Sequence, residues 1–374
     1  MLVTTPESRY MLADLTGVVN QLPNQYGYLN SLNLFTAAPT TQHSFILEVE
    51  KSDIRLLDAQ DSRLSRKADA LGSNAARQIA FPLIPYKVVE ALTPEEIQGV
   101  RQVGTANTPE TEQRVRARKL AKIRTSFDIT NEFLKAGAIK GRIFDADGTL
   151  RLDLFAQFGV TKKTVVIPVA DTSATSAIDA AIEELKAYME DNAGAGTIIN
   201  GEDITVLVDS AFFAALTSHP YMRDAYLQQQ TVLSYQQITG SLRTGRADGV
   251  QARMSEFHYR GVTFVEYRGQ FMDNRGKVHK LVESYNTAGD TAITTGVGHA
   301  FPNVTSLAGS DLFQIAYAPP FKMGYANTLG QPLYVFEYEK PRDEGIDFEA
   351  HSILMPFCTR PQLLVDILAE PRPA

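Results

Sequence analysis

The feature that most constrains the fold of this chain is a long segment without a partner of its own, residues 45–92. Two strand-like stretches, residues 45–57 and 78–92, flank a polar middle rich in charged residues, alanine, serine and glycine. A two-stranded ribbon of this kind is marginally stable in water because neither face is covered. Long excursions from a compact domain are also uncommon unless they are functional. We therefore expect an arm that lies on a neighbouring subunit, which favours polymerisation over catalysis.

A long helix is predicted after this ribbon. Thr108, Pro109 and Glu110 form a helix start signal, and the helix is expected to end near Gly137. Its apolar residues recur at helical spacing and form one stripe: Leu120, Ile123, Phe127 and Leu134. Six of the eleven residues in the range 114–124 are basic. Opposite an apolar stripe, basic residues usually form a solvated face or pair with a neighbour's carboxylates, so this interpretation is favoured over nucleic-acid binding.

The other segments predict a mixture of helices and strands. Residues 138–159 are expected to form a hairpin that turns at Asp147 and Gly148. A second hairpin is expected from residues 261–267 and 277–284. Further predicted elements are strands 165–169, 204–208, 348–355 and 363–368, and helices 178–189 and 211–216. Residues 1–44 are typical of an extended arm that becomes ordered by docking, and the whole pattern indicates an α+β protein.

Composition limits the class of protein further. At 374 residues the chain exceeds the size at which one core keeps growing, so two lobes are expected. The single cysteine, Cys358, excludes an internal disulfide and a zinc site built on paired thiolates. No apolar run approaches the length of a membrane span, and residues 1–10 lack the pattern of a signal peptide. The net charge of -7 argues against a dedicated nucleic-acid binder, because such affinity comes mainly from neutralising phosphates.

No catalytic, cofactor-binding or metal-binding constellation is recognisable. The histidines are dispersed, and none has the spacing of a helical zinc site: His43, His219, His258, His279, His299 and His351. Gly276 and Lys277 lack the other residues of a P-loop, and Ser310 lacks the glycines of a nucleophile elbow. Asp145 and Asp147 resemble the start of a calcium loop, but the later ligands are missing, which favours a tight turn. We therefore predict no catalytic residue, no cofactor and no metal.

Three parts of the sequence carry a resemblance to a known family. Residues 134–141 (LKAGAIKG) resemble that family's passage from its long helix into a hairpin. Residues 259–267 (YRGVTFVEY) resemble its strand pair before a glycine-rich loop. Residues 348–356 (FEAHSILMP), followed by 361–365 (PQLLV), resemble its closing strands. Together with the order of elements, they make the chain similar to the tailed-phage major capsid proteins of the lambda-type capsid protein E family.

The resemblance implies the Hong Kong-type capsid fold. This is an α+β fold with an N-terminal arm, an extended E-loop hairpin, a peripheral domain with a long spine helix, and an axial domain. The corresponding ranges would be 1–44 for the arm, 45–92 for the E-loop, 93–170 with 346–374 for the peripheral domain, and 171–345 for the axial domain.

The resemblance also implies a structural protein that is not an enzyme. Such a major capsid protein assembles as pentamers and hexamers into an icosahedral shell around the double-stranded DNA genome of a phage. It encloses DNA without sequence-specific binding and involves no membrane. Scaffold, portal and decoration proteins are the expected partners. The shell would be assembled in the cytoplasm of the bacterial host and would end as the capsid of the virion.

Three basic residues in the middle of the 45–92 segment are candidates for contacts between subunits. Arg63, Arg66 and Lys67 would pair with acidic residues of a neighbour. Each exposed pair contributes only about 0–1 kcal/mol, so stability would come from many simultaneous contacts. Two alternatives stay open at this point. One is an encapsulin-like compartment that packages proteins, and the other is a cytosolic α+β enzyme, because a fold alone does not fix function.

Overall fold

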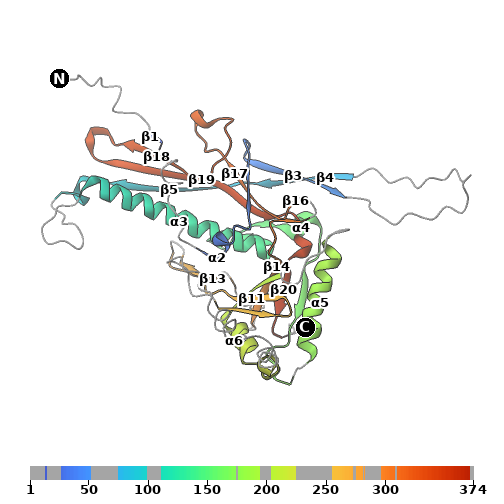
Figure 1. The fold of residues 1–374 in the computed structure, drawn as a ribbon. Coiled ribbons are helices and arrows are strands. Elements are labelled where there is room, and N and C mark those ends of the chain that lie inside the picture. Colours follow the sequence, from blue (N-terminus) through green and yellow to red (C-terminus); the bar gives the residue numbers. More distant parts are fainter. Residues whose placement is uncertain are drawn as a thin grey trace, which may run out of the picture.

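The structure is a computed structural model that describes residues 13–14, 27–51, 75–98, 111–173, 176–193, 204–224, 255–272, 275–280, 282, 296–307 and 310–370. Within these residues the chain is α+β, as expected, with two six-stranded sheets. Figure 1 shows the long helix α3 (Glu112–Lys140) running along the first sheet, while the second sheet lies beside α5 (Ser176–Asn192) and α6 (Ser210–Ser218).

The first sheet is elongated and mostly antiparallel. Its strand order is β1-β18-β19-β17-β2, and β5 also pairs with β19. Only the β17–β2 pair is parallel. The strands are β1 Ala13–Asp14, β2 Thr36–Pro39, β5 Ile84–Leu92, β17 Phe313–Ala318, β18 Tyr334–Glu339 and β19 Ile346–Cys358.

The second sheet is mixed, with the order β10-β11-β9-β14-β20-β8. The β11–β9 and β20–β8 pairs are parallel and the others antiparallel. The strands are β8 Lys163–Val166, β9 Ile204–Val208, β10 Glu256–Tyr259, β11 Val262–Glu266, β14 Val297–Pro302 and β20 Val365–Leu368. The strand and helix expected at 204–208 and 211–216 are present, and the Asp209 carboxylate accepts a hydrogen bond from the Phe212 N–H (2.8 Å), which caps α6.

The remaining elements are short. Among the described residues they are α2 Tyr28–Ser31, β6 Arg142–Phe144, β7 Leu150–Asp153, α4 Leu154–Phe158, β12 Gln270–Met272, β13 Val278–Lys280, β15 Ser306–Leu307 and β16 Ser310–Asp311, with single 3-10 turns at Pro94–Glu96, Met323–Tyr325, Pro341–Asp343 and Pro361–Leu363. None of the described helices is long and apolar enough to cross a membrane.

The 45–92 segment is built differently from the expected pair of stretches. The stretch expected at 78–92 is divided at Leu83 between two sheets. β4 (Ala75–Pro82) pairs with β3 (Ser44–Lys51) as a two-stranded ribbon, whereas β5 pairs with β19 in the first sheet. Exposed residues alternate with less exposed ones in both β4 and β5. Alternation of apolar and polar residues in the sequence therefore predicts that a strand forms, but not which strand it pairs with.

The long helix ends one turn later than the sequence predicts. Gly137 lies inside α3, where a Cβ atom would approach the Ile143 backbone to 3.1 Å, so a glycine here allows the helix to pack closely against β6. The helix stops at Gly141, which has φ +77° and donates to the carbonyls of Gly137 and Ala138. Left-handed geometry at the end of a helix is the usual role of glycine. The expected start signal at Thr108, Pro109 and Glu110 lies outside the described residues.

One predicted hairpin is wrong. Residues 261–267 do not pair with 277–284, because β11 pairs with β10 and β13 pairs with β12. Arg260 and Gly261 both have positive φ (48° and 81°), which is the geometry that joins two strands by a two-residue turn. The closing strands β19 and β20 join different sheets. By contrast, the hairpin expected from residues 138–159 is present around Asp147 and Gly148 as β6–β7. It is shorter than expected, because residues 138–140 belong to α3 and residues 154–158 form α4.

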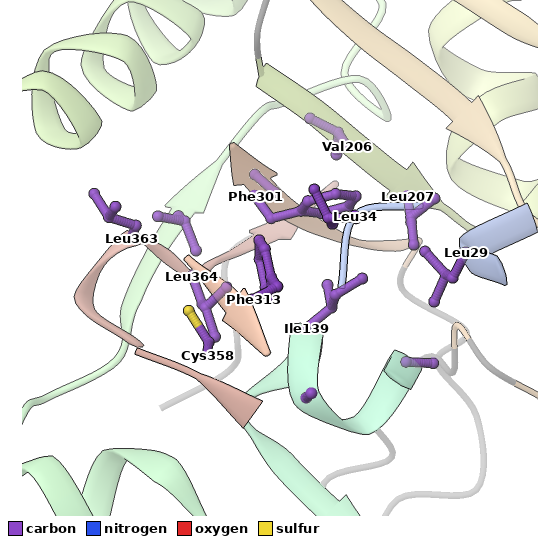
Figure 2. Close-up of a cluster of buried hydrophobic side chains, with 14 of the residues drawn as sticks. Leu29, Leu34, Ile139, Val206, Leu207, Phe301, Phe313, Cys358, Leu363 and Leu364 are labelled. Atoms are coloured by element: carbon purple, nitrogen blue, oxygen red, sulfur yellow. The ribbon is translucent and has the colours of Figure 1, made fainter. Parts of the chain in front are cut away.

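Two hydrophobic cores lie along α3. The first half of the helix contributes Val115, Leu120, Ile123 and Phe127 to a small core under the first sheet, with Leu333, Val335 and Phe348. The second half contributes Leu134 and Ile139 to a larger core that continues into the second sheet. Figure 2 shows part of it, with Ile139 near Leu29, Leu34, Phe313 and Phe301. The predicted apolar stripe is buried throughout, and α3 contributes side chains to both cores.

Candidate assembly surfaces

The β3–β4 ribbon has a buried root and a projecting end. At the root, Phe45 and Phe81 lie opposite each other and both contact Phe357 of β19, with ring centroids 5.2 and 4.7 Å apart. Ile46 faces solvent on the other side of the ribbon. Figure 1 shows the strands β3 and β4 on the opposite side of the molecule from the N-terminal half of α3 and pointing away from it. The aromatic root fixes the direction of the arm, because the strand cannot swing without removing two rings from the core.

The predicted contact residues cannot be placed on this arm. Arg63, Arg66 and Lys67 lie outside the described residues. Their pairing with acidic residues of a neighbour therefore stays a prediction.

The basic stretch of α3 pairs with carboxylates of its own chain. The ion pairs are Arg116 with Glu337 (2.9 Å), Lys119 with Glu96 (2.8 Å), Lys122 with Glu90 (3.1 Å) and Arg124 with Asp128 (3.2 Å). Glu90 lies on β5 and Glu337 on β18, so these contacts attach the helix to the first sheet. The sequence favours a solvated face or pairs with a neighbour's carboxylates over nucleic-acid binding. The structure shows ion pairs, but with carboxylates of the same chain.

One buried carboxylate joins three parts of the molecule. Glu132 of α3 is fully buried and accepts hydrogen bonds from the backbone N–H groups of Leu29 and Asn30, both at 2.9 Å. It also accepts one from the Tyr267 hydroxyl, which follows β11 in the second sheet (2.9 Å). Gly27 approaches so closely that a Cβ atom there would lie 2.1 Å from the Glu132 carboxyl carbon. Glu132 therefore holds the arm segment, the long helix and the second sheet together.

A cation completes this junction. Lys135 Nζ donates to Asn30 Oδ1 (2.7 Å), and Asn30 Nδ2 donates to the Asp128 carbonyl (3.3 Å). Burial raises the pKa of Glu132, and the hydrogen bonds from Leu29, Tyr267 and Asn30 oppose that rise only in part. Burial likewise lowers the pKa of Lys135. Sequence reasoning missed this junction, because an acidic residue on a charged helix is normally assigned to solvent. The apolar residues of the arm were the only available signal.

The Asp145 and Asp147 segment is a turn. The Asp145 carboxylate pairs with Arg151 (2.6 Å), and Asp147 Oδ1 accepts from the Thr149 N–H (2.8 Å). Both carboxylates therefore serve the hairpin itself, which agrees with the favoured interpretation. Within the part of the chain that the structure describes, no group of three or more His, Cys, Asp or Glu residues is placed to hold a metal ion.

Comparison with known proteins identifies the family. The profile of the family described as phage major capsid protein E matches residues 11–369. The chain belongs to the phage major capsid protein E family. It is 59% identical over 371 residues to the major capsid protein of Salmonella phage Felix O1 (isolate Felix O1-VT1), covering 99% of both chains. It is 28% identical over 364 residues to the major capsid protein of Pseudomonas phage KPP10, covering 96% of this chain and 97% of the relative.

A solved structure agrees at the level of the fold. A crystal structure of a protein ascribed to the capsid of a prophage in E. coli CFT073 covers 96% of this chain and 99% of its own, with TM-score 0.55 and 12% identity. The Hong Kong-type α+β capsid fold and the resemblance to the capsid protein E family are confirmed. Membership of a phage family favours the capsid interpretation over the encapsulin-like compartment.

A buried histidine has a structural role in this capsid-family chain. His299 of β14 contacts Asp366 of β20 through Nδ1 (2.8 Å), and Lys162 Nζ lies 2.6 Å from the same carboxylate. Burial lowers the pKa of His299 to about 4, so the ring is neutral near pH 7. Burial alone would raise the pKa of Asp366, but the contacts with His299 and Lys162 lower it to about 2. Lys162 also donates to the Lys140 carbonyl (2.7 Å), which ties the end of α3 to the second sheet.

Proposed function

We propose that this chain is the shell-forming subunit of a phage head, assembling as pentamers and hexamers into an icosahedral shell around double-stranded DNA. The observation that supports this most directly is the β3–β4 ribbon. Its root is anchored in the core by Phe45 and Phe81, while its outer face, including Ile46, stays exposed. A ribbon with one uncovered face is marginal by itself, so it gains stability by lying on another copy. The relatives at 59% and 28% identity carry the name major capsid protein.

The role of the subunit is structural and not enzymatic in this proposal. The family is one of structural proteins, and the carboxylates and histidines described above serve turns, ion pairs and buried junctions. The net charge of -7 suits a wall that encloses DNA without adhering strongly to it. The subunit would assemble in the cytoplasm of the host and would end in the capsid of the virion. Scaffold, portal and decoration proteins would be its partners.

The division into arm, E-loop, peripheral domain and axial domain is part of the proposal. Strand pairing supports two adjustments to the ranges expected from the sequence. β17 and β18 pair with β19, which favours assigning residues 313–339 to the peripheral domain. β8 and β20 belong to the second sheet, which favours assigning them to the axial domain.

Negative-stain electron microscopy tests the proposed function directly. The chain would be expressed alone and together with its neighbouring genes, and the products fractionated by size. Closed shells, or free pentamers and hexamers, are the expected result. A uniform monomer or small dimer under every condition would contradict the proposal and would return attention to an α+β enzyme.

A further inference from the structure

The face of the first sheet that points away from α3 carries a group of exposed apolar side chains. Strand register defines this face: Val89 of β5 lies opposite Glu349 of β19, which lies opposite Phe336 of β18. The neighbouring residues Val88, Ala350 and Val335 point to the other side and belong to the core under α3. The segment between β17 and β18 folds over the outer face, since Tyr325 packs edge-on against Phe336 and Tyr334.

We call the exposed side chains on this face the outer-face patch: Val89, Phe321, Met323, Leu329 and Tyr338. Met323 is 94% exposed, Phe321 67% and Leu329 60%, and these three lie within nine consecutive residues. A lone exposed apolar residue on a monomer needs no explanation, whereas several large ones gathered on one face point to an interaction site.

The segment that carries the patch is held in a fixed shape. Lys322 Nζ pairs with Glu349 (2.8 Å) and lies 4.0 Å from the centre of the Phe336 ring. The Tyr334 hydroxyl donates to the Leu329 carbonyl (3.1 Å) and accepts from the Gln331 N–H (2.8 Å). These contacts already hold the segment in one conformation while its apolar side chains point outward. Binding therefore costs less conformational entropy, and this favours association.

The patch is continuous with the root of the assembly ribbon. The Gly330 N–H donates to the Thr40 carbonyl (3.0 Å). His43 stacks on Phe321 with ring centroids 4.1 Å apart, and its Nε2 lies 3.0 Å from the Pro319 carbonyl. The Leu83 N–H in turn donates to the His43 carbonyl, which closes the base of the β3–β4 ribbon (3.1 Å). A neighbour that covers the base of the ribbon therefore also meets Phe321.

The local charge suits an acidic partner with an apolar surface. Lys87 and Lys322 both pair with the single carboxylate of Glu349, so these three groups carry one net positive charge. Each copy of the chain carries -7, so whole chains repel one another at long range, and the positive charge of the patch favours a partner only through acidic groups that lie within the contact itself. The copy also has apolar surface to offer, since Phe144 and Leu150 lie opposite each other on β6–β7 and both are exposed. A contact of this kind, between two different surfaces of identical chains, is a heterologous interface.

We propose that the outer-face patch is a contact surface for a second copy of this chain, which covers Phe321, Met323 and Leu329 in the assembled shell. This inference rests on the proposed shell-forming function. It adds a contact at the segment between β17 and β18 to the one expected from the ribbon.

Thiol labelling of Met323→Cys tests the inference. Cys358 is fully buried, and burial raises the pKa of its thiol to about 12, so the native chain offers a maleimide no competing thiolate. The variant is labelled as unassembled subunits and as shells formed by this chain alone. We expect labelling in shells to be slower by about tenfold or more, because the thiol reacts only when the contact opens. Shells dissociated in guanidinium should recover full reactivity, which controls for oxidation of the thiol.

Two labelling results would overturn the inference. One is equal labelling of subunits and shells. The other is protection only in particles that contain further phage proteins, since the occupant would then not be a second copy. If the unmodified chain forms no particle by microscopy, the proposed function fails first, and that failure is seen before any labelling.

Charge substitution provides a second, independent measurement. Met323→Glu with Leu329→Glu should lower the yield of shells by about tenfold or more, because charges buried in an apolar contact are costly. The melting temperature of the subunit should stay unchanged, because both side chains are exposed in it. Met323→Leu with Leu329→Met is the matched control and should assemble normally. Normal shell yield from the acidic pair would overturn the inference.

Discussion

At the residue scale, Glu132 shows how one side chain can join parts that are distant in sequence. Its carboxylate accepts hydrogen bonds from two backbone N–H groups of the arm and from the hydroxyl of Tyr267, which follows β11 of the second sheet. In Glu132→Gln the amide NH₂ would face one of these N–H groups, leaving a buried donor without an acceptor. We expect the free energy of unfolding to fall by about 1–3 kcal/mol, measured by urea denaturation of the unassembled subunit.

A matched substitution separates this effect from the loss of a charge. Glu112→Gln lies on the same helix, where the side chain is exposed and pairs with Arg116. Exposed pairs of this kind contribute about 0–1 kcal/mol, so the control should change stability much less. Equal losses in the two variants would mean that the buried hydrogen bonds of Glu132 do not matter.

The His299 and Asp366 pair predicts a direction for the dependence of stability on pH. The folded pKa of His299, about 4, lies below its ordinary 6.5 because of burial, so the folded chain binds fewer protons than the unfolded chain between these values. Stability therefore falls as the pH drops from 6.5 to 4. The pKa of Asp366, about 2 rather than 3.8, extends the loss to lower pH, since burial is outweighed by its contacts with His299 and Lys162.

The histidine variant isolates this contribution. His299→Gln keeps a neutral donor beside Asp366 but cannot take up a proton. Between pH 6.5 and 4, the unmodified subunit should lose more unfolding free energy than the variant, by an amount on the order of 1–3 kcal/mol. Urea denaturation at several pH values measures both slopes, and identical slopes would show that His299 is not the group responsible.

At the element scale, the end of α3 is set by Gly141. Its φ of +77° is unfavourable for any side chain, and a Cβ atom would also lie 2.2 Å from the buried ring of Phe155. Gly148 in the β6–β7 turn has φ +85° with nothing within 4 Å of its Cβ position. We expect Gly148→Ala to cost about 1–2 kcal/mol from backbone strain alone and Gly141→Ala clearly more. Thermal unfolding compares the two, and equal costs would argue against the steric part.

The same helix shows how far sequence reasoning reaches at this scale. The apolar stripe on α3 was predicted because helical periodicity is local. The end of α3 was placed too early, since a glycine that allows close packing and a glycine that ends a helix look alike in sequence. Strand partners were harder still. β10 and β11 meet through Arg260 and Gly261, which is not a recognised turn signal, and the split at Leu83 depends on β19, more than 250 residues away.

At the scale of the whole molecule, the sequence predicts the fold class, but it predicts only some of the candidate assembly surfaces. The ribbon was predictable because its two strands are local and alternate in burial. The Glu132 junction and the outer-face patch were not, since each brings together residues from three separate segments. The charge pattern of the sequence did not identify a contact surface either, because the basic stretch of α3 forms ion pairs within the subunit. Surfaces made of distant segments require the tertiary arrangement before they can be recognised.

The last prediction concerns assembly through the arm. Reversing Arg63, Arg66 and Lys67 to glutamate should impair shell formation, because each exposed contact is weak, about 0–1 kcal/mol, but is repeated at every subunit of a closed shell. The fold of the subunit should persist, as judged by circular dichroism and the urea midpoint, since the ribbon root at Phe45 and Phe81 is untouched. Arg63→Lys with Arg66→Lys keeps the charge and should assemble normally. Normal shells from the triple reversal, counted by negative-stain microscopy at equal protein concentration, would show that the arm does not rely on these charges.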